Sequence, residues 1–316
     1  MTQRSAGRPG PRHFLRDDDL APHELHEVLD LAAAMKLARH DYRPLAGPQA
    51  VALLFDKPTL RTQLSFSVGV AELGGQAIVV DGRLAGIGER ESIPDSTRVL
   101  ERQVAAIVWR TYGQERIVEM ASVSRVPVVN ALTDQFHPCQ LLADLLTIRE
   151  HKVTLAGVRL AYVGDTGNNM AHSYLLAGAA AGMHVGLAGP EAFQPDPAVI
   201  EAAVRIAKDT GATITVGTDP WAVLDGADVV ATDTWISMGQ EKEKALRETP
   251  LRPYAVTGAA LRSAAADAIV LHCLPAYRGS EIDAGVLDGP QSVVWDEAEN
   301  RLHAQKALLT WLLERS

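Results

Sequence analysis

Cysteine is scarce in this chain of 316 residues, which contains only Cys139 and Cys273. Two cysteines cannot build the framework of bridges that holds a small secreted domain together, and such scarcity is typical of a reducing compartment. No apolar run reaches the length of a membrane span, and residues 1–16 are too polar for a signal peptide. The sequence therefore predicts a cytoplasmic protein without a membrane partner.

Positive charge is also in short supply, because 30 Lys and Arg stand against 39 Asp and Glu and leave a formal net charge of -9. This balance opposes broad attraction to nucleic acid, so we expect no nucleic-acid partner. Any phosphate group must be bound by a local site. The apolar share of 47% is ordinary for a globular protein and excludes a disordered or fibrous chain.

The glycine fingerprint of a dinucleotide-binding loop is missing as well. The segment Val163-Gly-Asp-Thr-Gly-Asn-Asn-Met170 resembles such a strand-to-helix loop but lacks the spacing G-x-G-x-x-G. A dehydrogenase is therefore the least favoured enzyme class. The two asparagines at the expected helix start suit a small polar ligand better.

Short apolar runs, by contrast, recur along the whole chain and alternate with helical patterns. Such runs are typical of parallel strands covered on both faces, so the fold class predicted is α/β. The expected strands are Val51–Phe55, Ala77–Val80, Ala105–Trp109, Val126–Val129, Val158–Val163, Val185–Leu187, Ile214–Val216, Val229–Ala231 and Ile269–Leu271. The expected helices include Leu60–Gly74, His137–Lys152, Asp196–Thr210 and Glu299–Arg315.

The length and this alternation predict two domains, each a mainly parallel sheet flanked by helices, with the active site in the cleft between them. We place the boundary at residues 150 and 151, so that the domains are 1–150 and 151–316. Ligands bind beyond the carboxyl ends of parallel strands, where most of the unusual residues lie. The C-terminal helix, about 299–315, is expected to pack back on the first domain.

The segment Phe55-Asp-Lys-Pro-Thr-Leu-Arg-Thr62 lies between an expected strand and an expected helix. A helix N-terminus offers free N–H groups and partial positive charge, and the hydroxyls of Thr59 and Thr62 with the guanidinium of Arg61 would complete a phosphate site. Ordinary helix capping by threonine, with Arg61 on the surface, explains the same residues equally well.

A second group follows two other strands of the first domain. Arg110 ends one strand, and His137 and Gln140 start the helix after another, so all three are expected to reach one crevice. Together they offer donors that polarise a carbonyl oxygen and stabilise an oxyanion. Taken alone, His137 is more often a helix-start residue than a catalyst.

The second domain adds three segments. Asp233 and Ser237, in Thr232-Asp-Thr-Trp-Ile-Ser-Met-Gly-Gln240, are suited to accept hydrogen bonds from an ammonium group. Cys273, in Leu271-His-Cys-Leu-Pro-Ala276, is by itself more often a small core side chain than a functional thiol. The charged stretch Trp295–His303, taken singly, is typical of a solvated helix start.

In this order the elements resemble the aspartate/ornithine carbamoyltransferase family over essentially the whole chain, from Arg12-His-Phe-Leu-Arg16 to the terminal helix. Phe136-His-Pro-Cys-Gln140, the Asp233–Gln240 segment with its Ser-Met pair, and His272-Cys-Leu-Pro275 resemble the ornithine branch. The resemblance implies transfer of a carbamoyl group from carbamoyl phosphate to the side-chain amine of L-ornithine, which gives L-citrulline and phosphate in arginine biosynthesis or a urea-cycle type of step.

The resemblance also implies a role for particular residues. Thr59, Leu60, Arg61 and Thr62 would enclose the phosphate, and Arg110, His137 and Gln140 would contact the carbamoyl group. Asn169, Asp233, Ser237 and Met238 would hold the α-amino and α-carboxylate groups of ornithine, while Cys273, Leu274 and Arg301 complete the reaction site. Arg110, His137, Cys273 and Arg301 are the implied catalytic residues. The implied assembly is a homotrimer or a multiple of trimers, without metal or organic cofactor.

Two loops depart from the family pattern. The phosphate segment has Thr59-Leu60-Arg61-Thr62 followed by Gln63, where the family usually has Ser-Thr-Arg-Thr followed by Arg. In the loop 82–91, Gly86 stands where the family has a Gln that reaches the neighbouring subunit's donor site, and Glu89 stands in place of an Arg. If Gly86 is simply a lost contact, Gly86→Gln restores about 1 kcal/mol and roughly fivefold donor affinity. If Glu89 and Arg90 have rebuilt the loop, the change is neutral or harmful.

Other functions remain open from these residues. The altered loops are compatible with a paralogue of the same fold that has a different amine acceptor or an altered donor site. A non-catalytic binding or regulatory protein is disfavoured because Arg61, Arg110, His137 and Cys273 are all present.

Overall fold

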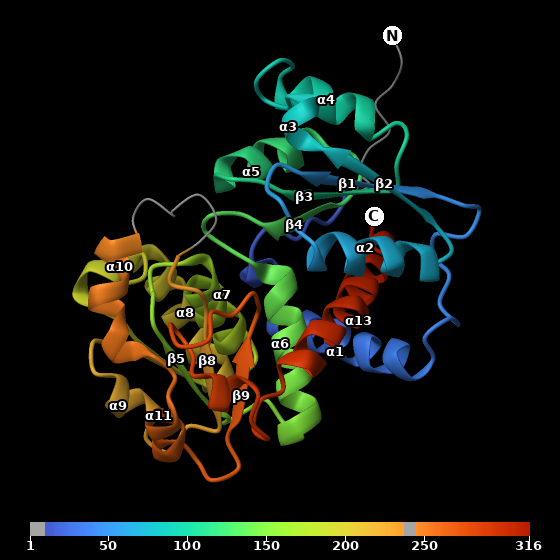
Figure 1. Ribbon diagram of the computed structural model, residues 1–316. Coiled ribbons are helices and arrows are strands. Elements are labelled where there is room, and N and C mark those ends of the chain that lie inside the picture. The colour runs from blue at the N-terminus through green and yellow to red at the C-terminus, as the bar shows by residue number, and fades with distance from the viewer. Residues whose placement is uncertain (1–9, 237–243) are drawn as a thin grey trace.

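The computed structural model describes residues 10–236 and 244–316, and it contains two parallel β-sheets, each flanked by helices (Figure 1). This is the fold class that the alternating apolar runs predict. Within those residues, no helix is long and apolar enough to cross a membrane.

The first sheet has the strand order β2-β1-β3-β4, with all pairs parallel. Its strands are β1 (Ala50–Phe55), β2 (Gln76–Asp81), β3 (Ala106–Arg110) and β4 (Val128–Leu132). The helices of this half are η1 (Asp17–Asp19), α1 (Pro22–Leu37), α2 (Arg61–Glu72), α3 (Gly82–Ala85), α4 (Ile93–Leu100), α5 (Gln114–Val123) and α6 (Pro138–Lys152). Phe66 of α2 packs on one face of the sheet and Ile117 of α5 on the other, which explains the all-apolar sequence of β1.

The second sheet has the order β7-β6-β5-β8-β9 and is also parallel. Its strands are β5 (Arg159–Val163), β6 (His184–Ala188), β7 (Thr213–Gly217), β8 (Val229–Thr232) and β9 (Ile269–His272). Its helices are α7 (Asn169–Ala180), η2 (Glu191–Phe193), α8 (Pro197–Thr210), α9 (Pro220–Leu224), α10 (Lys244–Leu251), η4 (Arg252–Tyr254), α11 (Gly258–Ser263) and α12 (Ala284–Leu287).

The expectation that every strand is covered on both faces is wrong for β2. This strand lies at the edge of the first sheet, where Ile78 is 40% and Val79 44% exposed. An edge position leaves apolar side chains uncovered unless another element or another chain packs against them.

Two long helices, α6 and α13 (Val294–Leu313), lie between the sheets (Figure 1). The last helix, α13, starts five residues earlier than the expected Glu299, and it packs against α6, α1 and α2 (Figure 1). The buried Lys306 of α13 forms an ion pair with Glu72 of α2, with Nζ 2.8 Å from a carboxylate oxygen. The chain therefore ends against helices of the first half.

The order of the strands decides where a site forms. The chain runs from β1 to β2 on one side and to β3 on the other, and from β5 to β6 on one side and later to β8 on the other. Loops diverge at such points and leave a crevice at the carboxyl ends of the strands. The segments after β1, β3, β5, β8 and β9 all reach this region.

Candidate active site

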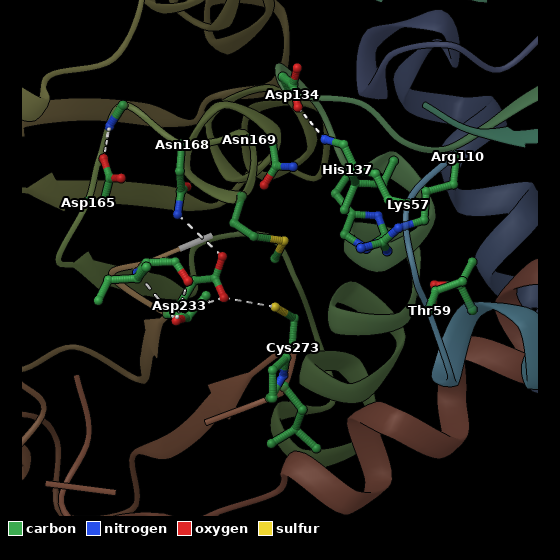
Figure 2. Close-up of a pocket in the computed structure, with 18 of the residues that line it drawn as sticks. Lys57, Thr59, Arg110, Asp134, His137, Asp165, Asn168, Asn169, Asp233 and Cys273 are labelled. Atoms are coloured by element: carbon green, nitrogen blue, oxygen red, sulfur yellow. Dashed lines mark hydrogen bonds and ion pairs between the residues drawn. The ribbon is translucent and has the colours of Figure 1, made fainter. Parts of the chain in front are cut away.

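A cavity of about 690 Å³ lies between the carboxyl ends of the two sheets. Its wall includes residues from both halves of the chain and from α13 (Figure 2). Most of the residues singled out in the sequence line it: Thr59, Leu60, Arg61, Thr62, Arg110, His137, Asn169, Asp233, Cys273, Leu274 and Arg301. The tertiary structure thus brings together segments that are more than two hundred residues apart in the chain.

Gln140 is placed differently from the expectation, and two further expected residues are not described. Gln140 is fully buried and does not line the cavity; it lies one hydrogen bond behind Arg301, whose Nη1 donates to Oε1 of Gln140 at 2.6 Å. Ser237 and Met238 lie outside the described residues.

The turn before α2 forms one wall of the cavity. Leu60 is the N-cap residue and forms no side-chain capping bond, so Thr59 and Thr62 are not consumed in capping this helix. Instead, the buried Oγ1 of Thr62 accepts a hydrogen bond from Nη2 of Arg301 at 2.6 Å. The start of α2 therefore lines the cavity together with Arg61 and Arg301, and a helix start beside guanidinium groups suits an anion.

Three guanidinium groups meet at this wall without a carboxylate of their own. Among the ion pairs of residues 10–236 and 244–316, none includes Arg61, Arg110 or Arg301. Arg61 donates through Nη2 to the carbonyl oxygen of Leu274, and the Nε atoms of all three arginines are buried without a partner in the described part of the chain. Uncompensated buried cations of this kind favour an anionic ligand.

Burial and mutual repulsion perturb the titration of these groups. Burial, followed by the charges of Arg301 and Arg61, lowers the pKa of Arg110 to about 10, so this guanidinium stays charged at neutral pH. Burial, followed by the same cluster of arginines, lowers the pKa of His137 well below its ordinary value of 6.5. His137 is therefore a neutral donor or acceptor beside charged donors.

The opposite wall is formed by β5, β8 and β9. Asp233 follows β8 and accepts hydrogen bonds from Nδ2 of Asn168 at 3.3 Å and from Sγ of Cys273 at 3.2 Å (Figure 2). Burial raises the pKa of the Asp233 carboxyl and raises that of the Cys273 thiol well above its ordinary value. Cys273 is thus a thiol that donates to Asp233, not a thiolate nucleophile. Asn169 bridges to the first half of the chain, with Nδ2 2.8 Å from the carbonyl oxygen of Thr133.

Sequence reasoning missed several residues of the cavity. Lys57 forms an ion pair with Asp134 and lies 4.7 Å from the ring centroid of Tyr112 (Figure 2). Asp165, after β5, forms a buried ion pair with Arg247 of α10. The position of Lys57 within the phosphate segment was a signal that could have identified it, whereas its contact with Asp134 depends on folding.

The segment Trp295–His303 is a helix start, as expected, but only one of its faces is solvated. The segment lies inside α13, and Glu297, Asn300, Arg301 and His303 are all buried. From the sequence alone, charged residues that a helix buries look the same as charged residues on its surface. The packing of α13 distinguishes the two.

Asp233, His272 and Cys273 place their potential metal-ligand atoms within 4.8 Å of one another. Nδ1 of His272 accepts from the N–H of Leu274 at 2.9 Å, and its Nε2 lies 3.3 Å from Glu281. Both ring nitrogens are therefore engaged, which leaves a metal an incomplete set of ligands at this cluster.

The chain matches two family models, one on each half. Residues 12–150 match the aspartate/ornithine carbamoyltransferase carbamoyl-P binding domain, and residues 156–312 match the Asp/Orn binding domain of the same family. The ornithine carbamoyltransferase of Clavibacter michiganensis subsp. michiganensis is 60% identical over 305 residues, covering 96% of this chain and 99% of that protein. That of Rhodococcus opacus is 59% identical over 302 residues and 96% of each chain.

Solved structures agree with the sequence relatives. The ornithine carbamoyltransferase from Pyrococcus furiosus has a TM-score of 0.91 and 42% identity, covering 95% of this chain and 96% of that one. The enzyme of the same name from Gloeobacter violaceus has a TM-score of 0.87 and 45% identity, covering 97% and 100%. With both halves matched and near-complete relatives at this identity, the chain belongs to the aspartate/ornithine carbamoyltransferase family.

Proposed function

We propose that this protein is an ornithine carbamoyltransferase, which transfers the carbamoyl group of carbamoyl phosphate to the side-chain amine of L-ornithine. The observation that carries the proposal is one cavity in which three guanidiniums, without an ion-pair partner among the described residues, share the lining with Asp233, Asn169 and Cys273. One wall suits a doubly charged phosphate, and the other suits an amino acid. The names of relatives about 60% identical over nearly the whole chain agree with this assignment.

The donor would bind at the turn before α2. Thr59, Leu60, Arg61 and Thr62 are proposed to enclose its phosphate, while Arg110 and the neutral His137 donate to its carbamoyl oxygen. In this arrangement the charged arginines act on the leaving phosphate and on the oxyanion that forms when the carbamoyl carbon is attacked. Gln140 has no amide proton left for the substrate, because both are used behind Arg301, and we assign it a supporting role.

The acceptor would bind on the second wall. Asn169, Asp233, Ser237 and Met238 are proposed to hold the α-amino and α-carboxylate groups, with Cys273 and Leu274 near the reacting amine. A primary amine has an ordinary pKa of about 10.4, so a cluster of arginines that disfavours the ammonium form assists its deprotonation. The neutral amine forms a bond to the carbamoyl carbon, and the bond from that carbon to the phosphate oxygen breaks. The amine nitrogen loses one proton, which leaves with the phosphate, and L-citrulline and hydrogen phosphate result.

We further propose that residues 1–150 and 151–316 form the donor-binding and acceptor-binding domains, with α13 returning to the first. The assembly proposed is a homotrimer, or a multiple of trimers, in the cytoplasm, and it serves arginine biosynthesis or a urea-cycle type of step. The exposed apolar residues Ile78 and Val79 of β2, with Leu84 in α3, support association of copies through this edge.

The deciding experiment is an assay of carbamoyl phosphate with a panel of amines. L-ornithine should be carbamoylated far better than putrescine, which lacks the carboxylate, or aspartate, which lacks the side-chain amine. Phosphate release and the carbamoylated product are both measured, so that donor hydrolysis is not counted as transfer. Equal or better turnover of putrescine or aspartate would reject ornithine as the acceptor and favour a paralogue of different specificity.

A further inference from the structure

Arg301 and three side chains behind it form a buried chain of hydrogen bonds. Oε1 of Gln140 accepts from Nη1 of Arg301 at 2.6 Å. Nε2 of the same amide donates to Oδ1 of Asp144 at 2.8 Å and to Oε1 of Glu297 at 3.0 Å. Gln140 and Asp144 are 0% exposed, and Glu297 is 1% exposed. Neither acid lines the cavity, so both are separated from it by Gln140 and Arg301.

The two acids determine which way the amide of Gln140 faces. Both of its N–H groups are used on carboxyl oxygens, which leaves only its oxygen for the guanidinium. The reversed amide would set an NH₂ group against Arg301 and an oxygen against two acids, which loses three hydrogen bonds in a buried place. Without the acids, neither orientation would be favoured so strongly.

The acid pair also places a negative charge close enough to act on Arg301. Burial raises the pKa of both carboxyls, and the charge of Asp144 raises that of Glu297 further. The carboxyl of Glu297 hydrogen-bonds to that of Asp144, which favours the proton on Glu297 and the negative charge on Asp144. Two adjacent buried carboxyls that share one proton supply one negative charge, relayed to Arg301 through the amide.

The network extends from α13 to both halves of the chain. Oε2 of Glu297 accepts from the backbone N–H of His272 at 2.9 Å, immediately before Cys273. Oδ2 of Asp144 accepts from the hydroxyl of Tyr174 at 2.6 Å, on the side away from Gln140. At the cavity end, Nη2 of Arg301 donates to Thr62 of the turn before α2. A change in the acids is therefore transmitted to Arg301 and to the donor wall.

We propose that Asp144 and Glu297 are positioning residues of the carbamoyl transfer, which act as one unit to fix the amide of Gln140 and, through it, the guanidinium of Arg301 in the cavity. The inference rests on the proposed function, because its first readout is the rate of that reaction. Misplacement of a reacting or stabilising group by about 1 Å can lower a rate by about a hundredfold.

The test compares Asp144→Asn, Glu297→Gln and the double variant with the wild-type protein, each as the full chain in its native assembly. Each single variant keeps one acid near Gln140 and should lower kcat about fivefold, whereas the double variant should lose about a hundredfold or more, beyond the product of the two. The KM for ornithine should change less than twofold in the single variants. Tyr174→Phe removes a hydrogen bond from the same carboxyl on its far side and is the matched control, with kcat within about twofold of wild type.

Inorganic phosphate binding, measured by calorimetry, gives a readout that needs no turnover. The double variant should bind phosphate about tenfold more weakly, because Arg301 is no longer held beside Thr62. A wild-type protein that binds phosphate but forms no citrulline would reject the proposed function, and its phosphate binding would still test the positioning role.

The inference would be overturned if both single variants had the wild-type kcat per folded molecule. This outcome decides the question even if the double variant does not fold. A double variant whose loss is no greater than the product of the single losses would also overturn it, as would a Tyr174→Phe control that loses as much as the double variant. Unchanged phosphate affinity in a folded double variant would likewise exclude action through Arg301.

Discussion

At the scale of single residues, the wall of the cavity at the turn before α2 holds three guanidiniums that form no ion pair within residues 10–236 and 244–316. Arg61, Arg110 and Arg301 come from three different parts of the chain. Burial removes the water that would otherwise screen their charges from one another and from a ligand. The cavity therefore favours an anion, and burial together with the charges of these arginines keeps His137 neutral.

The first prediction at this scale concerns Arg110. Replacing it by alanine should leave a folded protein whose turnover falls by orders of magnitude, because one donor to the developing oxyanion is worth roughly 3 to 4 kcal/mol of barrier. Steady-state kinetics of Arg110→Ala measures this loss, and Arg98→Ala serves as the control, because Arg98 is exposed on α4 and pairs only with Asp95 among the described residues. A loss of about tenfold or less would remove Arg110 from the mechanism.

The second prediction concerns the pH dependence that His137 imposes on stability. Its pKa in the folded protein lies well below the ordinary 6.5, so the unfolded chain binds a proton at this residue that the folded protein refuses. The free energy of unfolding should therefore decrease as pH falls from about 6.5 toward the folded pKa, and this contribution is absent at higher pH.

His137→Gln removes this contribution. The decrease in melting temperature between about pH 7.5 and about pH 5.5 should be smaller for the variant than for the wild type. The buried carboxyls and other histidines titrate in both proteins, so the difference between the two curves isolates His137. An equal or larger decrease in the variant would contradict the neutral state assigned to this residue.

At the scale of elements, the end of the short helix α3 explains why residue 86 is a glycine. Gly86 is the C-cap residue of α3, and its φ of 66° lies in the left-handed region. A Cβ built at this position would lie 2.8 Å from Cγ and Cδ of Arg90. The loop thus has a backbone that glycine suits and a side chain that fills the adjacent space. This geometry favours a rebuilt loop over a simple lost contact.

Gly86→Gln is accordingly expected to leave carbamoyl phosphate binding unchanged or weaker, because a side chain in the left-handed region costs about 1 kcal/mol and Arg90 must move. Gly86→Ala carries the same backbone strain without an amide and is the matched control. Donor and acceptor constants are measured for all three proteins under identical salt. Fivefold tighter donor binding by the Gln variant alone would restore the lost-contact explanation.

The elements themselves were largely predictable. The apolar runs at Val51–Phe55 and Ile269–Leu271 lie within β1 and β9, and the expected helices 137–152 and 196–210 correspond to α6 and α8 within one residue at either end. The early start of α13 at Val294 was missed, because its first turns carry acidic residues that resemble a solvent-exposed segment.

At the scale of the whole molecule, the uncovered edge of the first sheet bears on assembly. If β2 lies at a contact between copies, Val79→Lys should dissociate the proposed trimer, because a charge would be buried against apolar side chains. Mass photometry or sedimentation of wild type and variant measures the assembly. Val204→Lys, at a position of similar exposure on α8, is the control and should not change it. A Val79→Lys protein of unchanged mass would place the contact elsewhere.

The sequence by itself determined the order of strands and helices, because apolar periodicity and helix-start signals are local properties of the chain. It also identified segments that line the cavity, as Thr59–Thr62 and Cys273–Pro275 illustrate. Only the tertiary structure decided that Arg301 of the last helix meets Thr62, that Gln140 stands behind Arg301, and that Asp144 and Glu297 are buried together. These contacts join residues far apart in the chain, and their energies depend on burial, which exists only once the two sheets and α13 have packed.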